Sequence, residues 1–178
     1  MLGIQFDVCK TELIESRLAG ELPHDMVLRL AEKKARIVSS SFFDHLVLGA
    51  DTTVILDNDV LGKPAGTEEA AAMLSRLSGN SHTVLTGIAL VHEASGRSVT
   101  AVESTSVTFD ELSQEEIAEY VSTGSPLDKA GAYGIQDDPG ALFVSGIEGD
   151  FYNVMGLPLN RLYRLIKSDY GDFISPTF

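Results

Sequence analysis

The chain is short of cysteine, of basic residues and of long apolar runs, and each shortage excludes a class of protein. A single cysteine, Cys9, excludes an internal disulfide and a zinc site built from cysteines. Thirteen basic residues against 26 acidic ones give a formal net charge of −13, which repels nucleic acids and anionic membranes. No apolar run approaches the roughly 20 residues of a membrane span. We therefore expect neither a nucleic acid nor a membrane as a partner.

Two further features of the chain limit its class. The N-terminal residues, Met1 to Phe6, lack the charged and then apolar segments of a signal peptide, so we expect a cytoplasmic protein. With 178 residues, a hydrophobic content of 44% and no linker or repeat, residues 1–178 are predicted to form a single α/β domain with two lobes. The four histidines lack ligand spacing, and we interpret each as a structural or surface residue.

Hydrophobic periodicity and turn residues divide the chain into helices and strands. Helices are predicted from Pro23 to Ser41, Thr67 to Leu77, Ser113 to Gly124 and Pro158 to Lys167. Strands are predicted from Leu46 to Ala50, His82 to His92 and Ser98 to Phe109, the last two as an antiparallel pair. Thr67 is a candidate helix cap, and Ser113 opens a capping box. Between Leu127 and Gly156 the chain is rich in glycine, and no regular element is predicted there.

The most informative stretch joins the end of a strand to a hairpin. Asp51 and Thr52 follow an apolar run, and Lys63 returns to the same neighbourhood after an Asp/Asn turn. With Asp57-Asn58 as the loop, Thr52 faces Lys63, whereas with the loop one residue later Val54 does. Either register places Asp51 close to Lys63. Such a pair would suit a phosphate ligand, with the acid as a base or metal ligand and the lysine as a phosphate-binding cation. A solvated strand end with a surface lysine would leave the same pattern.

Two other segments could serve the same ligand. Asp128 to Gln136 contains small residues that let the backbone approach a ligand closely, with Lys129 able to meet a phosphate. The Gln136 amide could pair with the N3–H and a carbonyl of uracil or thymine. Lys34 leans towards the apolar side of its helix, so its stem could pack while its ammonium reaches a site. A glycine-rich surface loop and a helix with a charged outer face would explain these residues without any ligand.

Taken together and in order, these segments resemble the Maf family of nucleoside triphosphate pyrophosphatases. The resemblance runs from Gly3 to about Ile166 and is closest to the branch that cleaves dTTP and UTP. The matching segments are Gly49-Ala50-Asp51-Thr52, Leu61-Gly62-Lys63-Pro64, Leu77-Ser78-Gly79-Asn80-Ser81-His82, Asp128-Lys129-Ala130-Gly131-Ala132-Tyr133-Gly134-Ile135-Gln136 and Gly156-Leu157-Pro158.

The resemblance implies a fold, a reaction and partners. The fold is a curved mixed sheet flanked by helices, with a cleft between two lobes and often a homodimer. The reaction hydrolyses dTTP, UTP and modified pyrimidine nucleotides between the α- and β-phosphates, giving a nucleoside monophosphate and pyrophosphate. A divalent metal, Mg²⁺ or Mn²⁺, would offset the acid-rich surroundings of the phosphates.

The resemblance also implies roles for individual residues. Asp51 matches the proton acceptor and is a candidate metal ligand, and Glu15 matches an acid near the metal. Phosphate contacts fall to three lysines, Lys34, Lys63 and Lys129. The positions linked to base preference are Thr52 and Gln136.

One departure from the family concerns the start of the chain. Family members begin with a strand ending in Ser-x-Ser-Pro-Arg-Arg, and no counterpart precedes Leu2. We therefore expect a domain without its first strand and phosphate loop, through a start codon that lies upstream or through degeneration, and we favour the former. Two rival functions stay open: an inosine or xanthosine triphosphate pyrophosphatase, and a non-catalytic nucleotide-binding or cell-division regulatory protein.

Overall fold

Two long strands form the centre of the sheet. The computed structural model describes residues 5–136 and 139–173, and in it β3 (Ser81–His92) pairs antiparallel with β4 (Arg97–Phe109) along its whole length. A single 3-10 turn (Glu93–Ser95) joins them, and Gly96 closes this turn with a φ of 66°, a left-handed conformation that suits glycine. The predicted antiparallel pair is therefore confirmed, with each strand one residue longer at its N-terminal end.

The Asp/Asn hairpin resolves the two registers that the sequence left open. β1 (Val47–Leu56) pairs with β2 (Asp59–Leu61) so that Val54 faces Leu61, which makes Asp57-Asn58 the loop. Both loop residues have positive φ, 51° and 73°, as a two-residue turn between twisted strands requires. β1 is longer than the predicted strand from Leu46 to Ala50, because its pairing with β3 continues through Asp51 to Ile55.

The sheet has five strands in the order β2-β1-β3-β4-β5, with β5 (Val144–Glu148) at one edge. Every pairing among the described residues is antiparallel, which corrects the mixed sheet that the resemblance implied. Two of these pairs, β1–β2 and β3–β4, are tight hairpins, which join antiparallel neighbours, whereas adjacent parallel strands need a long crossover. The α/β class itself is confirmed, since helices flank the sheet.

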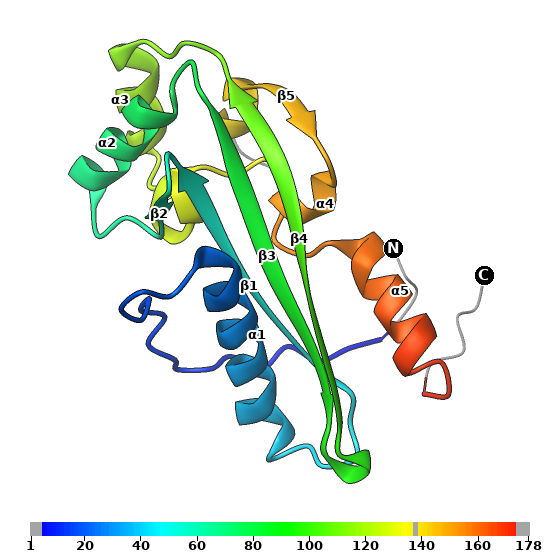
Figure 1. Cartoon of the computed structure of the whole chain (residues 1–178). Helices are drawn as coiled ribbons and strands as arrows, with labels where there is room; N and C mark the ends of the chain where they lie inside the picture. The colour runs from blue at the N-terminus through cyan, green and yellow to red at the C-terminus, as the bar shows by residue number, and fades with distance from the viewer. Residues whose placement is uncertain (1–4, 137–138, 174–178) are drawn as a thin grey trace.

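Helices cover both faces of the sheet, with α1 (Pro23–Ser39) on one face and α5 (Leu159–Asp169) on the other (Figure 1). Two glycines allow α1 to lie close to the strands. A Cβ at Gly49 would stand 2.1 Å from the Ala31 carbonyl oxygen, and a Cβ at Gly87 would stand 2.4 Å from the Val27 carbonyl oxygen. The side chain of Asp51, two residues after Gly49 on the same face, therefore points towards α1.

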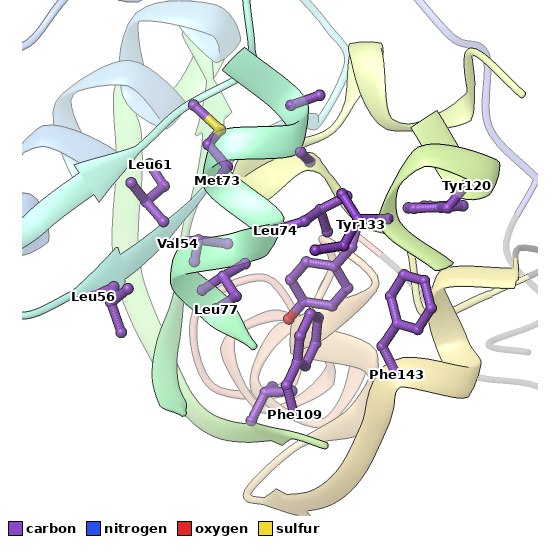
Figure 2. Packing of buried hydrophobic residues seen from close by; sticks show 14 of the residues in the cluster. Val54, Leu56, Leu61, Met73, Leu74, Leu77, Phe109, Tyr120, Tyr133 and Phe143 are labelled. Carbon is purple, nitrogen blue, oxygen red and sulfur yellow. The ribbon is translucent and has the colours of Figure 1, made fainter. Parts of the chain in front are cut away.

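The main core lies between a helical lobe and the end of the sheet that carries the β1–β2 hairpin (Figure 2). The lobe is formed by α2 (Thr67–Leu77) and α3 (Gln114–Ser122), which pack on the 3-10 turns η2 (Ser125–Asp128), η3 (Ala130–Ala132) and η4 (Pro139–Phe143). The labelled members of this core are Val54, Leu56, Leu61, Met73, Leu74, Leu77, Phe109, Tyr120, Tyr133 and Phe143.

His82 is a structural residue of this core, as interpreted from the sequence. It is 3% exposed, and its Nε2 lies 2.7 Å from the Tyr133 hydroxyl. Burial lowers the pKa of His82 to about 4 and raises the pKa of Tyr133 well above its usual range. The pair therefore links β3 to the η3 turn as neutral groups.

The helix ends agree with the sequence in most places. Ser113 forms the predicted capping box with Glu116. The predicted Thr67 cap is wrong, because Gly66 holds the capping position and Thr67 is already the first helical residue.

β5, α4 (Phe151–Val154) and the 3-10 turns were not predicted, since tertiary contacts hold these short pieces without any periodic pattern. Among the described residues, no helix has the length and apolar character needed to cross a membrane.

Candidate active site

A cavity of about 330 Å³ opens beside β1, where α1, the segment after β2, the loop before residue 137 and the turn after α4 meet. Over Val47–Thr53, β1 pairs with β3 alone among the described strands, so one edge of β1 is open at this point. All seven residues that the sequence singled out line this cavity: Glu15, Lys34, Asp51, Thr52, Lys63, Lys129 and Gln136. Their convergence is a structural finding, whereas their catalytic roles stay predictions.

The charged centre of the cavity joins one lysine to two acids. Lys34 Nζ lies 2.7 Å from Asp51 Oδ1 and 2.6 Å from Glu15 Oε1. The Asp51 side chain is only 7% exposed, whereas the Glu15 side chain is 39% exposed. Lys34 reaches the acids from α1, which lies close to β1 because Gly49 carries no side chain. The buried carboxylate is therefore held by a cation on its own face of the sheet.

Burial and pairing act on the pKa values of these groups in different directions. Burial raises the pKa of Asp51 above its ordinary value, and the attraction of Lys34 offsets only part of this effect. Burial alone would lower the pKa of Lys34, but its hydrogen bonds to Asp51 and Glu15 outweigh burial and raise that pKa. Lys34 is therefore charged at neutral pH, and Asp51 is a stronger base than a solvated aspartate.

Glu15 comes from the segment before α1, which has no regular secondary structure. Arg29 of α1 holds this segment: its Nη2 donates to Glu21 Oε2 at 2.8 Å and to the Ser16 carbonyl oxygen at 3.1 Å. Because Ser16 follows Glu15 directly, this contact ties the acid to the helix that carries Lys34. The sequence indicated only a charged outer helix face at Arg29, and this role could not be read from it.

The other two lysines differ in their surroundings. Lys129 Nζ donates to the Ser125 carbonyl oxygen at 2.7 Å and to Asp128 Oδ1 at 2.8 Å, so its ammonium is held in place. Asp128 therefore forms an ion pair with Lys129 at the edge of the cavity. Lys63 is exposed, and within the described part of the chain no hydrogen bond or ion pair is made by its ammonium. A hydrogen bond of 3.1 Å from Gly131 N to Gly62 O fixes these two segments together.

The rest of the cavity wall is uncharged. Thr52 and Gln136 lie there, together with backbone and apolar groups that the sequence did not single out for the site: Val154, Met155 and Ile135. Tyr133 also lines the cavity, although its hydroxyl is turned to His82. The nearby signal in the sequence was the family segment Gly156-Leu157-Pro158, and Gly156 itself lines the cavity. A ligand with a charged and an uncharged half would match the two parts of the cavity.

The acids of the site fit a divalent metal only in part. Among the described residues, no group of three or more histidine, cysteine, aspartate or glutamate side chains is placed to hold a metal ion. Glu15 and Asp51 do converge, since both accept from the Lys34 ammonium. Mg²⁺ is commonly bound through one or two carboxylates, with waters and substrate phosphates completing its shell. The two acids therefore suit a metal that arrives with a phosphate ligand.

The comparisons with known proteins agree with this geometry. A family model described as "Maf-like protein" matches residues 1–169. The chain belongs to the Maf family. It is 46% identical over 173 residues to a protein named dTTP/UTP pyrophosphatase from Salinibacter ruber, covering 97% of this chain and 85% of that protein.

Two more relatives of this Maf chain carry the same name, dTTP/UTP pyrophosphatase. The protein from Bacillus cereus (strain AH820) is 47% identical over 167 residues, which cover 94% of this chain and 86% of the relative. The protein from Symbiobacterium thermophilum is 51% identical over 165 residues, which cover 93% and 84% respectively. Thus the similarity extends over the whole cavity and not over one motif alone.

Proposed function

We propose that this Maf chain is a nucleoside triphosphate pyrophosphatase that hydrolyses dTTP and UTP to the nucleoside monophosphate and pyrophosphate. The observation that carries the proposal is one cavity that is lined by a buried carboxylate and three lysines beside an uncharged wall. The names of three relatives that are 46–51% identical support the choice of reaction and substrates. In a chain with a net charge of −13, such a local concentration of lysines is what a polyphosphate requires.

In the proposed reaction, a water oxygen attacks the α-phosphorus, the bond to the bridging oxygen breaks, and pyrophosphate leaves with that oxygen. Asp51 accepts the proton of the attacking water, since burial has raised its pKa. Lys63 and Lys129 line the cavity where the phosphates would lie and stabilise the charge that gathers on the leaving group. Lys34 keeps the Asp51 carboxylate in its position.

A divalent cation, Mg²⁺ or Mn²⁺, belongs to the proposal. Glu15 and Asp51 would hold it together with the substrate phosphates. When bound, the cation supplies positive charge to the phosphate oxygens. The chain's own residues then provide the proton acceptor and the remaining cations.

The uncharged wall would take the nucleoside. Thr52 and the Gln136 amide present hydrogen-bonding groups there, and an amide can donate to a carbonyl of uracil or thymine. A cytoplasmic location, where nucleoside triphosphates are made and used, belongs to the same proposal. The homodimer that the family resemblance implies stays a prediction.

The test is a nucleotide panel with the purified chain and Mg²⁺, followed by product analysis. We expect nucleoside monophosphate and pyrophosphate from dTTP and UTP. Turnover confined to ITP or XTP would instead indicate the purine-specific rival, and binding without turnover would indicate a non-catalytic nucleotide-binding protein. Release of inorganic phosphate in place of pyrophosphate would contradict the proposed site of cleavage.

A further inference from the structure

Three buried polar side chains lie directly behind the uncharged wall of the cavity. Thr86 of β3 and Asn153 of α4 are fully buried, and Thr105 of β4 is 1% exposed. Asn153 Nδ2 donates to the Val84 carbonyl oxygen and to Thr105 Oγ1, both at 3.0 Å. These contacts hold α4 on the sheet face opposite α1. None of the three side chains lines the cavity, so they are not part of the site described above.

This buried group reaches the cavity through one hydroxyl. Thr52 Oγ1 lies 2.9 Å from Thr86 Oγ1, its direct neighbour across the β1–β3 pair, and 3.5 Å from the Gly156 carbonyl oxygen. Thr86 Oγ1 lies 3.1 Å from the Asn153 carbonyl oxygen. Thr52 is half-buried and lines the cavity, whereas Thr86 is completely enclosed.

Counting protons gives this arrangement a direction, because each hydroxyl has one hydrogen to donate. A carbonyl oxygen only accepts, so the Thr86 hydrogen goes to Asn153 O, and Thr52 then donates to Thr86 Oγ1. If Thr86 donates to Thr52 instead, the Thr52 hydrogen turns to the Gly156 carbonyl oxygen. In both arrangements protein atoms use the Thr52 hydrogen, and only lone pairs of its oxygen face the cavity. Turning that hydrogen towards a ligand would lose one hydrogen bond within the protein.

We propose that Thr86 fixes the Thr52 hydroxyl as an acceptor, which selects a nucleobase with a ring N–H. The inference rests on the proposed function and specifies how its substrate would be chosen. Uracil and thymine offer an N3–H that can donate to such an oxygen. Cytosine has an unprotonated N3 at the same place, which would face the Thr52 lone pairs without a hydrogen between them. The loss of one hydrogen bond corresponds to a preference of about three- to tenfold. Thr86 acts through Thr52 and is a positioning residue.

The variant that tests this is Thr86→Val, which keeps the shape of the side chain and removes its hydroxyl. The Asn153 carbonyl oxygen keeps a partner in this variant, because Gly156 N donates to it at 2.9 Å. The Thr52 hydrogen then keeps only the longer contact of 3.5 Å with the Gly156 carbonyl oxygen, so turning it towards cytosine costs less than in the wild type. We expect the ratio of kcat/KM for UTP over CTP to fall by about three- to tenfold. Thr86→Ser restores the hydroxyl, so its ratio should return to that of the wild type.

A matched control separates hydroxyl direction from the position of α4. Thr105→Val removes a hydroxyl from the same buried group, where it contacts Asn153 and Asp150, but this hydroxyl does not contact Thr52. Its UTP/CTP ratio should stay within twofold of the wild type. An equal fall in Thr105→Val and Thr86→Val would overturn the inference and assign the effect to movement of α4.

Binding measurements keep this test independent of the proposed chemistry. The α,β-methylene analogues of UTP and CTP do not require hydrolysis, and calorimetry gives a Kd for each with the wild type and the three variants. If UTP is not hydrolysed but its analogue binds better than that of CTP and Thr86→Val abolishes the difference, the inference stands and the proposed reaction fails. If the wild type binds both analogues equally, the inference is wrong, whatever the enzyme hydrolyses.

Discussion

At the scale of single residues, the buried Asp51 carboxylate is the group on which the proposed chemistry depends. It is almost enclosed, and its one cationic hydrogen-bond donor in the described structure is Lys34. We predict that Asp51→Asn lowers the rate of pyrophosphate release by about 100-fold or more, because an amide cannot accept the proton of the attacking water. The measurement is steady-state release of pyrophosphate from dTTP and UTP.

The matched control for this prediction is Asp57→Asn. Asp57 lies in the exposed β1–β2 turn with a φ of 51°, a conformation that asparagine adopts readily. The same chemical change at this position should leave the rate within twofold of the wild type. Near-wild-type activity of Asp51→Asn would remove this carboxylate from the mechanism.

At the scale of elements, the contact between α1 and the sheet decides where Lys34 lies. A Cβ at Gly49 would stand 2.1 Å from the Ala31 carbonyl oxygen and 2.8 Å from the Ala35 nitrogen, both backbone atoms that can move only with the whole helix. We predict that Gly49→Ala lowers the free energy of unfolding by at least about 2 kcal/mol. Urea unfolding followed by circular dichroism measures this loss.

Gly62→Ala is the control for this element. No heavy atom lies within 4 Å of a Cβ at Gly62, so the change should stay within about 0.5 kcal/mol of the wild type. Because α1 carries Lys34, the folded fraction of Gly49→Ala should also release pyrophosphate more slowly. A Gly49→Ala protein as stable as the wild type would contradict the close approach of α1.

At the scale of the whole molecule, the buried His82–Tyr133 pair makes stability depend on pH. Burial holds the pKa of His82 at about 4 in the folded protein, whereas the ordinary value of 6.5 applies to the unfolded chain. Between these values the unfolded state binds one proton more, so the free energy of unfolding falls as the pH falls. From pH 7 to pH 5 we predict a loss of about 2 kcal/mol from this residue alone.

Urea unfolding at pH 7 and pH 5 tests the prediction with two variants. His82→Gln removes the titrating group, so it should lose about 2 kcal/mol less than the wild type over this range. His24→Gln changes an exposed histidine and should behave like the wild type. The same pH dependence in His82→Gln as in the wild type would show that other groups are responsible.

The sequence by itself determined those elements whose cause is local. Pro23 begins α1, the Ser113–Glu116 capping box opens α3, and Asp57-Asn58 forms the hairpin turn, because each acts on backbone atoms a few residues away. Resemblance of ordered motifs also identified the family, and every residue that it assigned to the site lines one cavity.

Only the tertiary structure decided how these parts are held together. Asn153 contacts Val84 and Thr105, 69 and 48 residues away, and no periodic pattern records such contacts. Nor could the sequence show that His82 of the core would contact Tyr133 of the cavity wall. The same holds for the contact between the buried Thr86 of β3 and Thr52. These side-chain hydrogen bonds depend on the distances between segments that are far apart in the sequence, and those distances are set only when the chain folds.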